Sequence, residues 1–435
     1  MFCRILFPKI NLHYSSFATI RTTYFLMYIR GKMVKDSQNT FFAWLPVIVI
    51  SCAAFIFNTS EFIPIALLSA IANDFGISEA NAGILITMYA WVVACASLPL
   101  MIMFSKMELK RLMLGVIAFF VLSHILSALS QDFFTLMASR IGVALSHALF
   151  WSIATIMAVK AAPKGRQSLA LSCIIVGTSL ALSAGLPLGR IVGLYMDWRA
   201  SFGYIGVAGF LVMIVFWRVF PTMPNTDSIT LSTLPTLIKN KPLRKIYLLT
   251  AFIITAHFTA YSYIEPFLAK CAELDSAIIT FVLMLFGVMG ILAGFLFSKF
   301  YERYHRIFVF YCLFGISASL LLLHPLSFTE VGIIILCVFW GLAIMLFNLV
   351  FQSQTIAALS MTKATAVGMS IFSGIYNVGI GGGALIGGLI SENIALQGIG
   401  YIGGSIAFGA CIFFMRKMAF ARVFHRFVSK RFSKK

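Results

Sequence analysis

Apolar stretches of about 20 residues recur along the chain, and clusters of charged or turn-forming residues end each of them. A helix rises about 1.5 Å per residue, so such a stretch can cross a hydrocarbon layer about 30 Å thick. Helices are required there because lipid offers backbone N–H and C=O groups no partner. The pattern predicts an all-α membrane protein with twelve transmembrane helices, at 43–68, 81–104, 112–130, 133–159, 167–190, 201–220, 246–269, 276–298, 307–326, 329–352, 365–390 and 397–415.

A polar segment at 221–245 is the longest break between the predicted spans and divides them into two sets of six. Weak echoes recur in the same order on either side of it. They pair Phe104-Ser-Lys106 with Phe297-Ser-Lys299, Gly185-Leu-Pro-Leu-Gly189 with Gly383-Ala-Leu-Ile-Gly387, and Glu61-Phe-Ile-Pro64 with Glu265-Pro266. Two pseudo-symmetric halves with a substrate site between them near the midplane are typical of secondary transporters. The glycine spacing itself is interpreted as close packing of helices.

The sequence therefore predicts five parts. They are an N-terminal cytoplasmic segment at 1–42, a six-helix half at 43–220, a cytoplasmic central loop at 221–245, a second six-helix half at 246–415, and a basic cytoplasmic tail at 416–435. Residues 1–32 are too interrupted by basic residues to span a bilayer, and they lack the core and cleavage site of a signal peptide. Either translation starts at Met33 and 1–32 is not translated, or this segment is a disordered basic tail.

The basic residues fall on one side of the predicted membrane. If the chain starts in the cytoplasm, all but four of its 33 Lys and Arg residues lie in cytoplasmic segments, the exceptions being Arg140, Arg190, Arg199 and Lys270. This is the positive-inside rule, so both termini are expected in the cytoplasm. The net charge of +19 follows from this topology and does not indicate a nucleic-acid partner. The expected contact of the basic tail is with anionic lipid headgroups.

The 60% hydrophobic and 11% charged content excludes an ordinary soluble domain. No phosphate-binding loop of the form GxxxxGK[ST] occurs, which argues against an ATP-driven pump. The His and Glu residues are too dispersed for a metalloprotease motif, and no nucleophile constellation is present, so an enzyme is not expected. The eight Cys residues show neither a disulfide framework nor a metal spacing and are interpreted as apolar packing. No cofactor is expected.

Charged residues within the predicted spans gather toward the outer face. Counting the helical rise places Glu61 about 27 Å into the first span, and Arg190 and Glu265 near the outer ends of theirs. Arg140 lies about 10 Å below the outer face. Two acids and two bases could form a static ion-pair network that holds helix ends. The alternative, which we favour, is a gate and proton relay, because charges at membrane depth are costly and rarely incidental.

A second layer, nearer the middle of the membrane, is polar but almost uncharged. Its members are Asn58, His147, Trp151, His257, Tyr261, Tyr376 and Asn377. Aromatic rings can cover the apolar face of a sugar while amides and imidazoles bind its hydroxyl groups. The layer therefore indicates a neutral, hydroxyl-rich ligand. The alternative is that each of these groups bonds its own or a neighbouring backbone.

Several of these residues lie in stretches that carry a family resemblance. The stretches are Ala54-Phe-Ile-Phe-Asn-Thr-Ser-Glu-Phe-Ile-Pro64, Tyr89-Ala-Trp-Val-Val93, Ser139-Arg-Ile-Gly-Val-Ala144 with Ser146-His-Ala148, Gly185-Leu-Pro-Leu-Gly-Arg-Ile-Val-Gly193, and Ala260-Tyr-Ser-Tyr-Ile-Glu-Pro-Phe267. In them the chain resembles the major facilitator superfamily, its drug:proton antiporter branch, and within that branch the bacterial sugar efflux transporters.

The resemblance implies the major facilitator fold and a location in the bacterial cell inner membrane. It also implies export of arabinose-like sugars or thiogalactosides by proton antiport, with the proton as coupling ion and the protein working as a monomer. The superfamily's arginine in the fourth helix falls on Arg140, and its acidic partner in the first helix on Glu61. A multidrug:proton antiporter is the alternative, with Glu61 or Glu265 as the anion that would attract cationic drugs.

The chain departs from the family pattern at two places. The loop between the second and third helices, Ser105-Lys-Met-Glu-Leu-Lys-Arg111, keeps only the basic residues of the usual motif. In the fifth helix Leu186 separates Gly185 from Pro187, and Arg190 replaces a glycine. The first departure puts the family's conformational latch in question, and the second bears on proton antiport.

Overall fold

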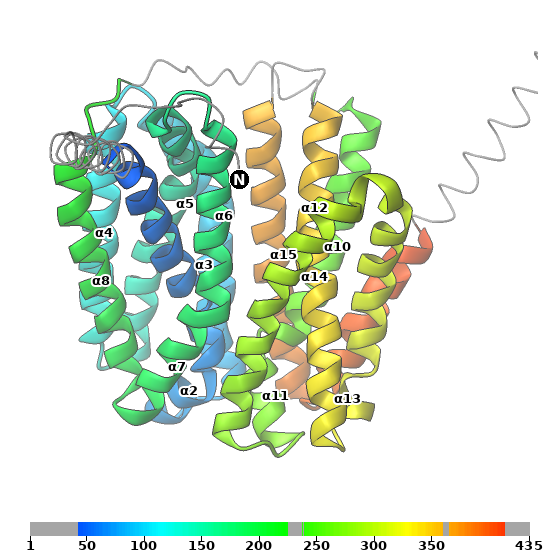
Figure 1. The fold of residues 1–435 in the computed structure, drawn as a ribbon. Helices are drawn as coiled ribbons and strands as arrows, with labels where there is room; N and C mark the ends of the chain where they lie inside the picture. Colours follow the sequence, from blue (N-terminus) through cyan, green and yellow to red (C-terminus); the bar gives the residue numbers. More distant parts are fainter. Residues whose placement is uncertain (1–41, 225–236, 238, 360–364, 414–435) are drawn as a thin grey trace, which may run out of the picture.

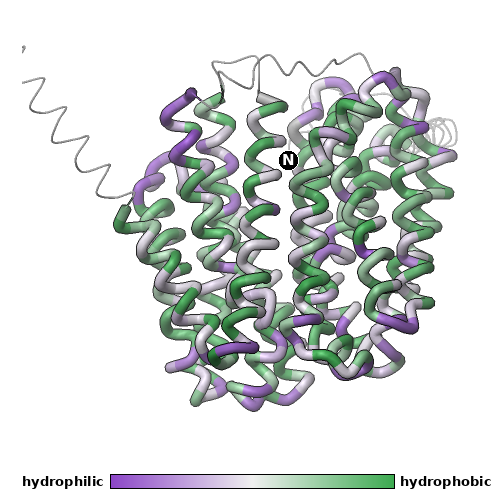
Figure 2. Tube along the Cα trace, turned by 180° about the vertical axis from the view of Figure 1, so that it is seen from behind, coloured by the Kyte–Doolittle hydropathy of each residue, from purple (hydrophilic) through white to green (hydrophobic). Residues whose placement is uncertain are grey.

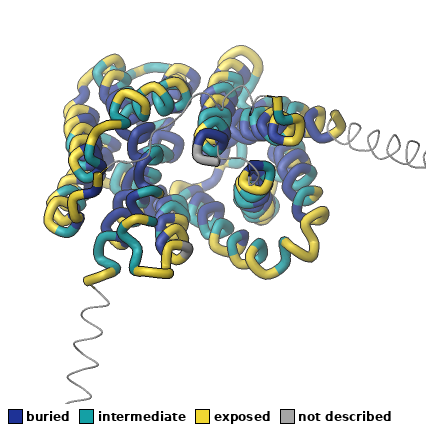
Figure 3. The backbone as a smooth tube through the Cα atoms, turned by 90° about the horizontal axis from the view of Figure 1, so that it is seen from above, coloured by how far each residue is buried: buried dark blue, intermediate teal, exposed yellow. Residues whose placement is uncertain are grey.

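The computed structural model describes residues 42–224, 237, 239–359 and 365–413, and within them the regular elements are helices that run between two ends of the molecule (Figure 1). The predictions for most of 1–42, for much of the central loop and for the tail at 416–435 lie outside the described residues. In Figure 1 the first half of the chain lies on the left and the second half on the right. Seen from above, the helices form two groups (Figure 3).

The first half contains six spans, one of which includes a short π-helix, and one short separate helix, α2. They are the helix Phe42–Ala66, α2 (Leu68–Phe75), α3 (Glu79–Met103), α4 (Leu109–Ala128), α5 (Phe133–Ala161), α6 (Gln167–Leu180) continued by the π-helix η1 (Ala181–Gly185) and α7 (Leu186–Tyr195), and α8 (Trp198–Val219). The second half contains α10 (Lys241–Tyr261), α11 (Ile264–Lys270), α12 (Ser276–Leu321), α13 (Leu323–Leu326), α14 (Glu330–Leu359), α15 (Thr365–Asn393) and the helix Gly398–Phe413.

Ten of these helices are long and apolar enough to cross a membrane. One of the ten, α12, has 46 residues, a length of about 69 Å that exceeds twice the hydrocarbon thickness. Its backbone leaves helical geometry at Tyr304 (φ −124°, ψ 28°), so α12 is two spans joined by a bend. With α12 counted as two and Gly398–Phe413 added, the described residues contain the twelve predicted spans, and the predicted fold class is confirmed.

The two ends of the bundle differ in charge. The connections at one end carry basic residues, and we call this the basic end, at the top of Figure 1. Its residues are Lys106, Lys110, Arg111, Lys160, Lys164, Arg166, Arg218, Lys239, Lys241, Arg244, Lys245, Lys299, Arg303 and Arg306. At the opposite, acidic end lie Asp74, Glu79, Asp132, Asp197, Glu273, Asp275, Glu330 and Glu392. Hydrophilic positions gather at both ends, with hydrophobic ones between them (Figure 2).

Glycines set how closely the first and fifth spans pack. A Cβ atom added at Gly185 would overlap Thr59, and one added at Gly189 would overlap Ile63. The π-helix ends at Gly185, just before Pro187, whose missing N–H removes one α-helical hydrogen bond. The prediction that this glycine spacing serves close helix packing is confirmed.

The same arrangement recurs in the second half. A Cβ atom at Gly383 would overlap Thr255 and Phe258 of α10, and one at Gly387 would overlap Thr259. The eleventh span therefore packs on the seventh as the fifth packs on the first. The echo between the two glycine motifs corresponds to equivalent contacts in the two halves.

The loop between α3 and α4, where the sequence departs from the family motif, has its own structural role. The carboxylate of Glu108 caps α4 by accepting hydrogen bonds from Lys110 N (3.0 Å) and Arg111 N (2.9 Å). It also accepts one from the backbone N–H of Met223, beyond the end of α8. Burial raises the pKa of Glu108, but these backbone amides outweigh burial and leave the pKa below its usual range.

Replacing Glu108 with Gln should lower the melting temperature of the purified protein at pH 7 by a few degrees, since losing a helix cap costs about 1 kcal/mol. A carboxyl whose folded-state pKa is depressed stabilises the fold above its unfolded pKa, and this stabilisation is lost as the pH falls through the folded pKa. The difference in melting temperature between wild type and variant should therefore stay constant from pH 7 to about pH 5 and shrink at lower pH. Glu302→Gln, an exposed carboxylate at the same end, is the control and should show no such difference.

Candidate functional site

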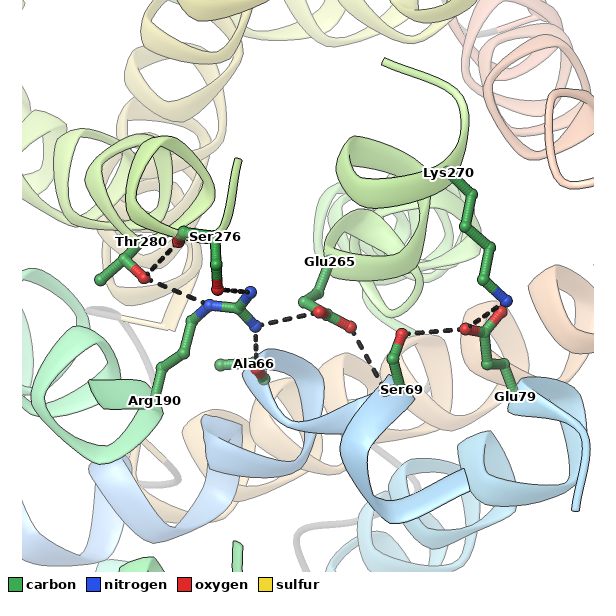
Figure 4. A network of polar contacts seen from close by, with 8 residues as sticks. All are labelled: Ala66, Ser69, Glu79, Arg190, Glu265, Lys270, Ser276 and Thr280. Carbon is green, nitrogen blue, oxygen red and sulfur yellow. Dashed lines mark hydrogen bonds and ion pairs between the residues drawn. The ribbon is translucent and has the colours of Figure 1, made fainter. Parts of the chain in front are cut away.

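Arg190 of α7 lies at the acidic end, between the two halves of the molecule. Its Nη1 is 3.0 Å from Oε1 of Glu265 on α11, and it also donates to the carbonyl oxygen of Ala66 (2.6 Å). Its Nε donates to Thr280 Oγ1 at 3.2 Å and its Nη2 to Ser276 Oγ at 3.4 Å. Figure 4 shows the guanidinium surrounded by these acceptors from both halves. Each of its three nitrogens therefore has a partner.

The network continues through Ser69 of α2 to a second ion pair (Figure 4). The backbone N–H of Ser69 donates to Oε2 of Glu265 (3.2 Å), and its hydroxyl donates to Oε1 of Glu79 (2.8 Å). Glu79 in turn pairs with Lys270 Nζ at 2.7 Å. Each half thus supplies one acid and one base to a crossed pair of salt bridges. We call Ser69, Glu79, Arg190, Glu265 and Lys270 the acidic-end latch.

The two salt bridges of the latch differ in burial. The side chains of Arg190 and Glu265 are 3% and 7% exposed, whereas that of Lys270 is 60% exposed. Removing one partner of a buried pair leaves an uncompensated charge and costs about 3–5 kcal/mol, whereas an exposed pair is worth about 0–1 kcal/mol. The Arg190–Glu265 pair is therefore the stronger part of the latch.

Two polar contacts at the basic end each stay within one half. Glu108 bonds Met223 within the first half, and the Tyr247 hydroxyl donates to the carbonyl of Gly368 within the second. The latch, in contrast, joins the halves directly. The latch thus joins the two halves by polar contacts at the acidic end.

Deeper in the first half lies a second group of ionisable residues. His147 Nε2 is 3.6 Å from Glu61 Oε2, just beyond hydrogen-bond distance. Arg140, also on α5, donates through Nη2 to the carbonyl of Ser60 (2.7 Å) and through Nη1 to its hydroxyl (3.3 Å). The guanidinium stands over the ring of Tyr89, 4.8 Å from its centroid. We call these five residues the Glu61 cluster.

A small cavity of about 10 Å³, enough for about one water molecule, adjoins the Glu61 cluster. Both halves line it: Glu61, Phe62, Pro64, Ile65, Leu85, Ile86, Tyr89 and Arg140 from the first, and Phe258 and Ile380 from the second. Three buried polar atoms nearby have no hydrogen-bond partner among the described residues, namely Tyr89 Oη, Arg140 Nε and His147 Nδ1. Since buried polar groups are almost always paired, these atoms indicate unused capacity for a ligand, a proton or water.

The second half contributes an aromatic cluster of His257, Tyr261, Phe286 and Trp340. Trp340 Nε1–H donates to His257 Nδ1 at 3.1 Å, which places the proton of a neutral imidazole on Nε2. The His257 ring stacks on Tyr261 with centroids 5.0 Å apart, and Tyr261 stacks on Phe286 at 4.8 Å. All four side chains are buried. His257 and Tyr261 are therefore held by neighbouring rings in this conformation.

The predicted polar layer is divided in the structure. Asn58 lies one turn before Glu61 and is half-buried, as is Trp151, whose ring centroid is 6.1 Å from that of His147. Tyr376 of α15 reaches across from the other half, close enough to Glu61 for its hydroxyl to interact electrostatically with the carboxylate.

Asn377 donates to Ser373 O of its own helix at 3.0 Å, while its buried Oδ1 has no partner in the described part of the chain. Asn58, His147, Trp151 and Tyr376 thus gather around Glu61, apart from His257 and Tyr261.

The predicted outer layer also separates into two groups. Arg190 and Glu265 form one pair across the halves, whereas Glu61 and Arg140 lie together within the first half and face different partners. Glu61 approaches His147, which the depth count had placed in the other layer. Depth alone does not report the direction in which a helix turns its side chains.

Several residues of these groups were not predicted as site residues from the sequence: Ser60, Ser69, Glu79, Tyr89, Lys270 and Trp340. Neither was His124, whose Nε2 lies 2.7 Å from the hydroxyl oxygen of Ser60. Tyr89 begins one of the stretches that carry the family resemblance, and His124 is a titratable residue in the middle of an apolar span. Both were signals of a polar site.

The comparison with known proteins decides the family. A sequence profile described as the Major Facilitator Superfamily matches residues 50–368. The chain belongs to the major facilitator superfamily. It is thus a multi-pass membrane protein and a secondary transporter of small molecules, and not an enzyme.

Solved structures of other transporters share the fold of this superfamily member. A bacterial homolog of the human lysosomal transporter Spinster, inward-facing and unoccupied, matches with a TM-score of 0.63 and 15% identity over 85% of this chain and 92% of that one. The human organic anion transporter MFSD10 matches with a TM-score of 0.62 and 12% identity, over 85% of this chain and 98% of that one. A POT family transporter in complex with 5-aminolevulinic acid matches with a TM-score of 0.68 and 11% identity, over 86% of this chain and 95% of that one. At these identities the likeness concerns the fold alone.

The unequal burial of the latch pairs gives a test by double-mutant cycles. Glu265→Gln should lower the melting temperature of the purified protein more than Glu79→Gln, because it leaves the buried Arg190 charge without a partner. Combining Arg190→Gln with Glu265→Gln should cost less than the two single changes added together. The matched cycle of Glu79→Gln and Lys270→Gln should be additive within about 1 kcal/mol. Equal coupling in both cycles would contradict this account of the latch.

Proposed function

We propose that this superfamily member exports small sugars, of the arabinose or thiogalactoside kind, across the bacterial inner membrane in exchange for protons. Substrate binding is assigned to Asn58, His147, Trp151, His257, Tyr261, Tyr376 and Asn377. Proton coupling and gating are assigned to Glu61, Arg140, Arg190 and Glu265. The observation that carries the proposal is the Glu61 carboxylate, 11% exposed, at a cavity between the halves that Arg140 and apolar and aromatic side chains also line.

The character of the neighbouring side chains supports a neutral substrate. Asn58, Trp151 and Tyr376 are half-buried and carry no fixed charge. Amide and phenol groups can exchange hydrogen bonds with sugar hydroxyls, while the flat rings cover the apolar face. Of the two anions that could attract a cationic drug, Glu265 is already neutralised by Arg190. A multidrug exporter would therefore depend on Glu61 alone.

The position of Glu61 supports proton coupling. Its carboxylate lies within the membrane-spanning part of the chain, 3.6 Å from an imidazole nitrogen and beside Arg140. An ionisable group at such depth is costly when charged and can exchange protons as its surroundings change. One proton that moves inward across 100 mV gains about 2.3 kcal/mol, enough for about fiftyfold solute accumulation.

The latch indicates which step of an export cycle this conformation would represent. By the positive-inside rule the basic end is the cytoplasmic one, so the latch closes the outer face. In an exporter, the conformation closed on the outside is the one that accepts substrate from the cytoplasm. Export would then require the latch to open after the basic end has closed around the substrate.

The substrate can be tested with the full-length protein in proteoliposomes. Efflux of radiolabelled arabinose and of a lipophilic cation should be measured with and without an imposed pH gradient. Gradient-dependent movement of the sugar alone is expected. Movement of the cation alone would replace the sugar proposal with the multidrug alternative, and movement of neither would refute both substrate classes.

Replacement of Glu61 with Gln should abolish gradient-driven sugar efflux, because the amide cannot carry a proton. Sugar exchange without a gradient, which needs only binding and rocking of the halves, should persist within about threefold of wild type. Glu330→Gln, a change of the same type at the acidic end, should leave both activities unchanged. Gradient-driven efflux by the Glu61→Gln variant would remove Glu61 from the coupling role.

A further inference from the structure

Ser60 joins two basic side chains in the interior of the first half. Its hydroxyl oxygen is 2.7 Å from His124 Nε2 on α4 and 3.3 Å from Arg140 Nη1 on α5. Its carbonyl oxygen accepts a further hydrogen bond from Arg140 Nη2 at 2.7 Å. The three residues are 0–1% exposed. They form a closed arrangement that has no part in the substrate-binding assignment above.

The chemistry of the donors fixes the direction of these hydrogen bonds. A guanidinium only donates, so the Ser60 oxygen accepts from Arg140 and its own proton is free for His124 Nε2. His124 is then a neutral imidazole that carries its proton on Nδ1. A cationic His124 would face Arg140 across one oxygen atom, which like-charge repulsion in a buried site disfavours. His124 thus accepts the Ser60 proton and leaves the Ser60 oxygen free to accept from Arg140.

The arrangement bonds Arg140 to residue 60, and the described residues show no ion pair within 4.0 Å between its guanidinium and the carboxylate of residue 61. The guanidinium lies between the rings of Tyr89 (4.8 Å) and Phe202 (5.4 Å), and its Nε has no hydrogen-bond partner among the described residues. Glu61 approaches His147 instead. The small cavity touches both Glu61 and Arg140, so there is room between them.

We propose that Ser60 and His124 are positioning residues that hold Arg140 away from Glu61 and thereby set the proton affinity of that carboxyl. While Arg140 is bound to Ser60, its charge acts on Glu61 only across the cavity, and Glu61 holds its proton more tightly than it would in a direct ion pair. Transfer of Arg140 from Ser60 to Glu61 favours loss of the proton. The proposal rests on the role of Glu61 as the proton carrier under the proposed function.

Among the groups that face Glu61, Arg140 has the largest effect on whether the carboxyl keeps its proton. The neighbouring helices present Arg140 and His147 from α5, Tyr89 from α3, Tyr376 from α15 and Phe258 from α10. In this described set only Arg140 carries a permanent charge. An opposite charge within about 4–6 Å stabilises a carboxylate enough to move its titration by about 1–3 pH units. The position of Arg140 is therefore the largest available control on the proton of Glu61.

The test uses a readout that does not depend on the transported substrate. A hydrophobic carbodiimide reacts with protonated carboxyl groups in apolar surroundings, and the modified residue can be identified by mass spectrometry of peptides. Labelling of Glu61 in the purified full-length protein should be followed against pH, with Glu61→Gln as the blank. Ser60→Ala and His124→Phe each remove one part of the arrangement that holds Arg140.

In both variants the labelling midpoint should move to lower pH, by about one unit for Ser60→Ala. At a fixed pH above the wild-type midpoint this is roughly a tenfold loss of labelling. Ser60→Thr keeps a hydroxyl and should keep the wild-type midpoint. Ser127→Ala is the matched control, since it removes a buried 2.7 Å hydrogen bond between α4 and α5, to Ser139, without contacting Ser60 or Arg140.

An unchanged or raised midpoint in both Ser60→Ala and His124→Phe would overturn the proposal, as would an equal shift in Ser127→Ala. A purely structural role would lower the amount of folded protein without moving the midpoint. If the proteoliposome assay shows that sugar is not the substrate, the midpoints are unaffected. If Glu61 is not the proton carrier, gradient-driven efflux survives Glu61→Gln although the midpoint shift remains.

Discussion

The cost of taking a charge out of water governs this structure. Four ionisable side chains, Glu61, Arg140, Arg190 and Glu265, are buried or nearly so in a chain that must also cross lipid. Arg190 and Glu265 meet this cost together, because each is the other's partner and further hydrogen bonds come from backbone groups and from the hydroxyls of Thr280 and Ser276. Glu61 and Arg140 do not pair directly, although they line the same cavity. The first pair therefore holds a conformation, and the second pair is poised to change.

The local sequence was sufficient for the spans and for the packing of the halves. The predicted spans follow from hydropathy, which is a property of consecutive residues. Their ends differ from the ends of the observed helices by a few residues because capping residues set where a helix begins. α4 begins at Leu109, before its predicted start, because Glu108 caps it and the basic residues of its first turn lie at the membrane surface. Close packing at the glycine motifs could also be predicted from the sequence. Glycines at helical spacing have no side chain and so allow a second helix to approach closely.

The partners of the charged residues could not be read from the sequence. Glu61 and Glu265 look alike, each followed closely by proline in equivalent spans, and their depths are similar. The fold gives Arg190 to Glu265 and leaves Glu61 to face His147. Which partner a carboxylate meets depends on the rotation of each helix about its axis, and this depends on packing across the whole bundle. Ser60 and His124 were missed for the same reason, because a single polar residue in an apolar span does not disclose what lies opposite it.

The two sites are connected by one short stretch of backbone. Ser60 and Glu61 belong to the Glu61 cluster, while Ala66 accepts from Arg190 and Ser69 donates to Glu265 at the latch. Between Ala66 and Ser69 the chain leaves helical geometry at Leu67 (φ −118°, ψ 14°), where the first span ends and α2 begins. If transfer of Arg140 to Glu61 moved the first span, the movement would act at this break on the residues of the acidic-end latch. Glu61 approaches a partner within its own half, whereas Glu265 is bonded across the halves. Ten consecutive residues, from Ser60 to Ser69, therefore join the Glu61 cluster to the latch.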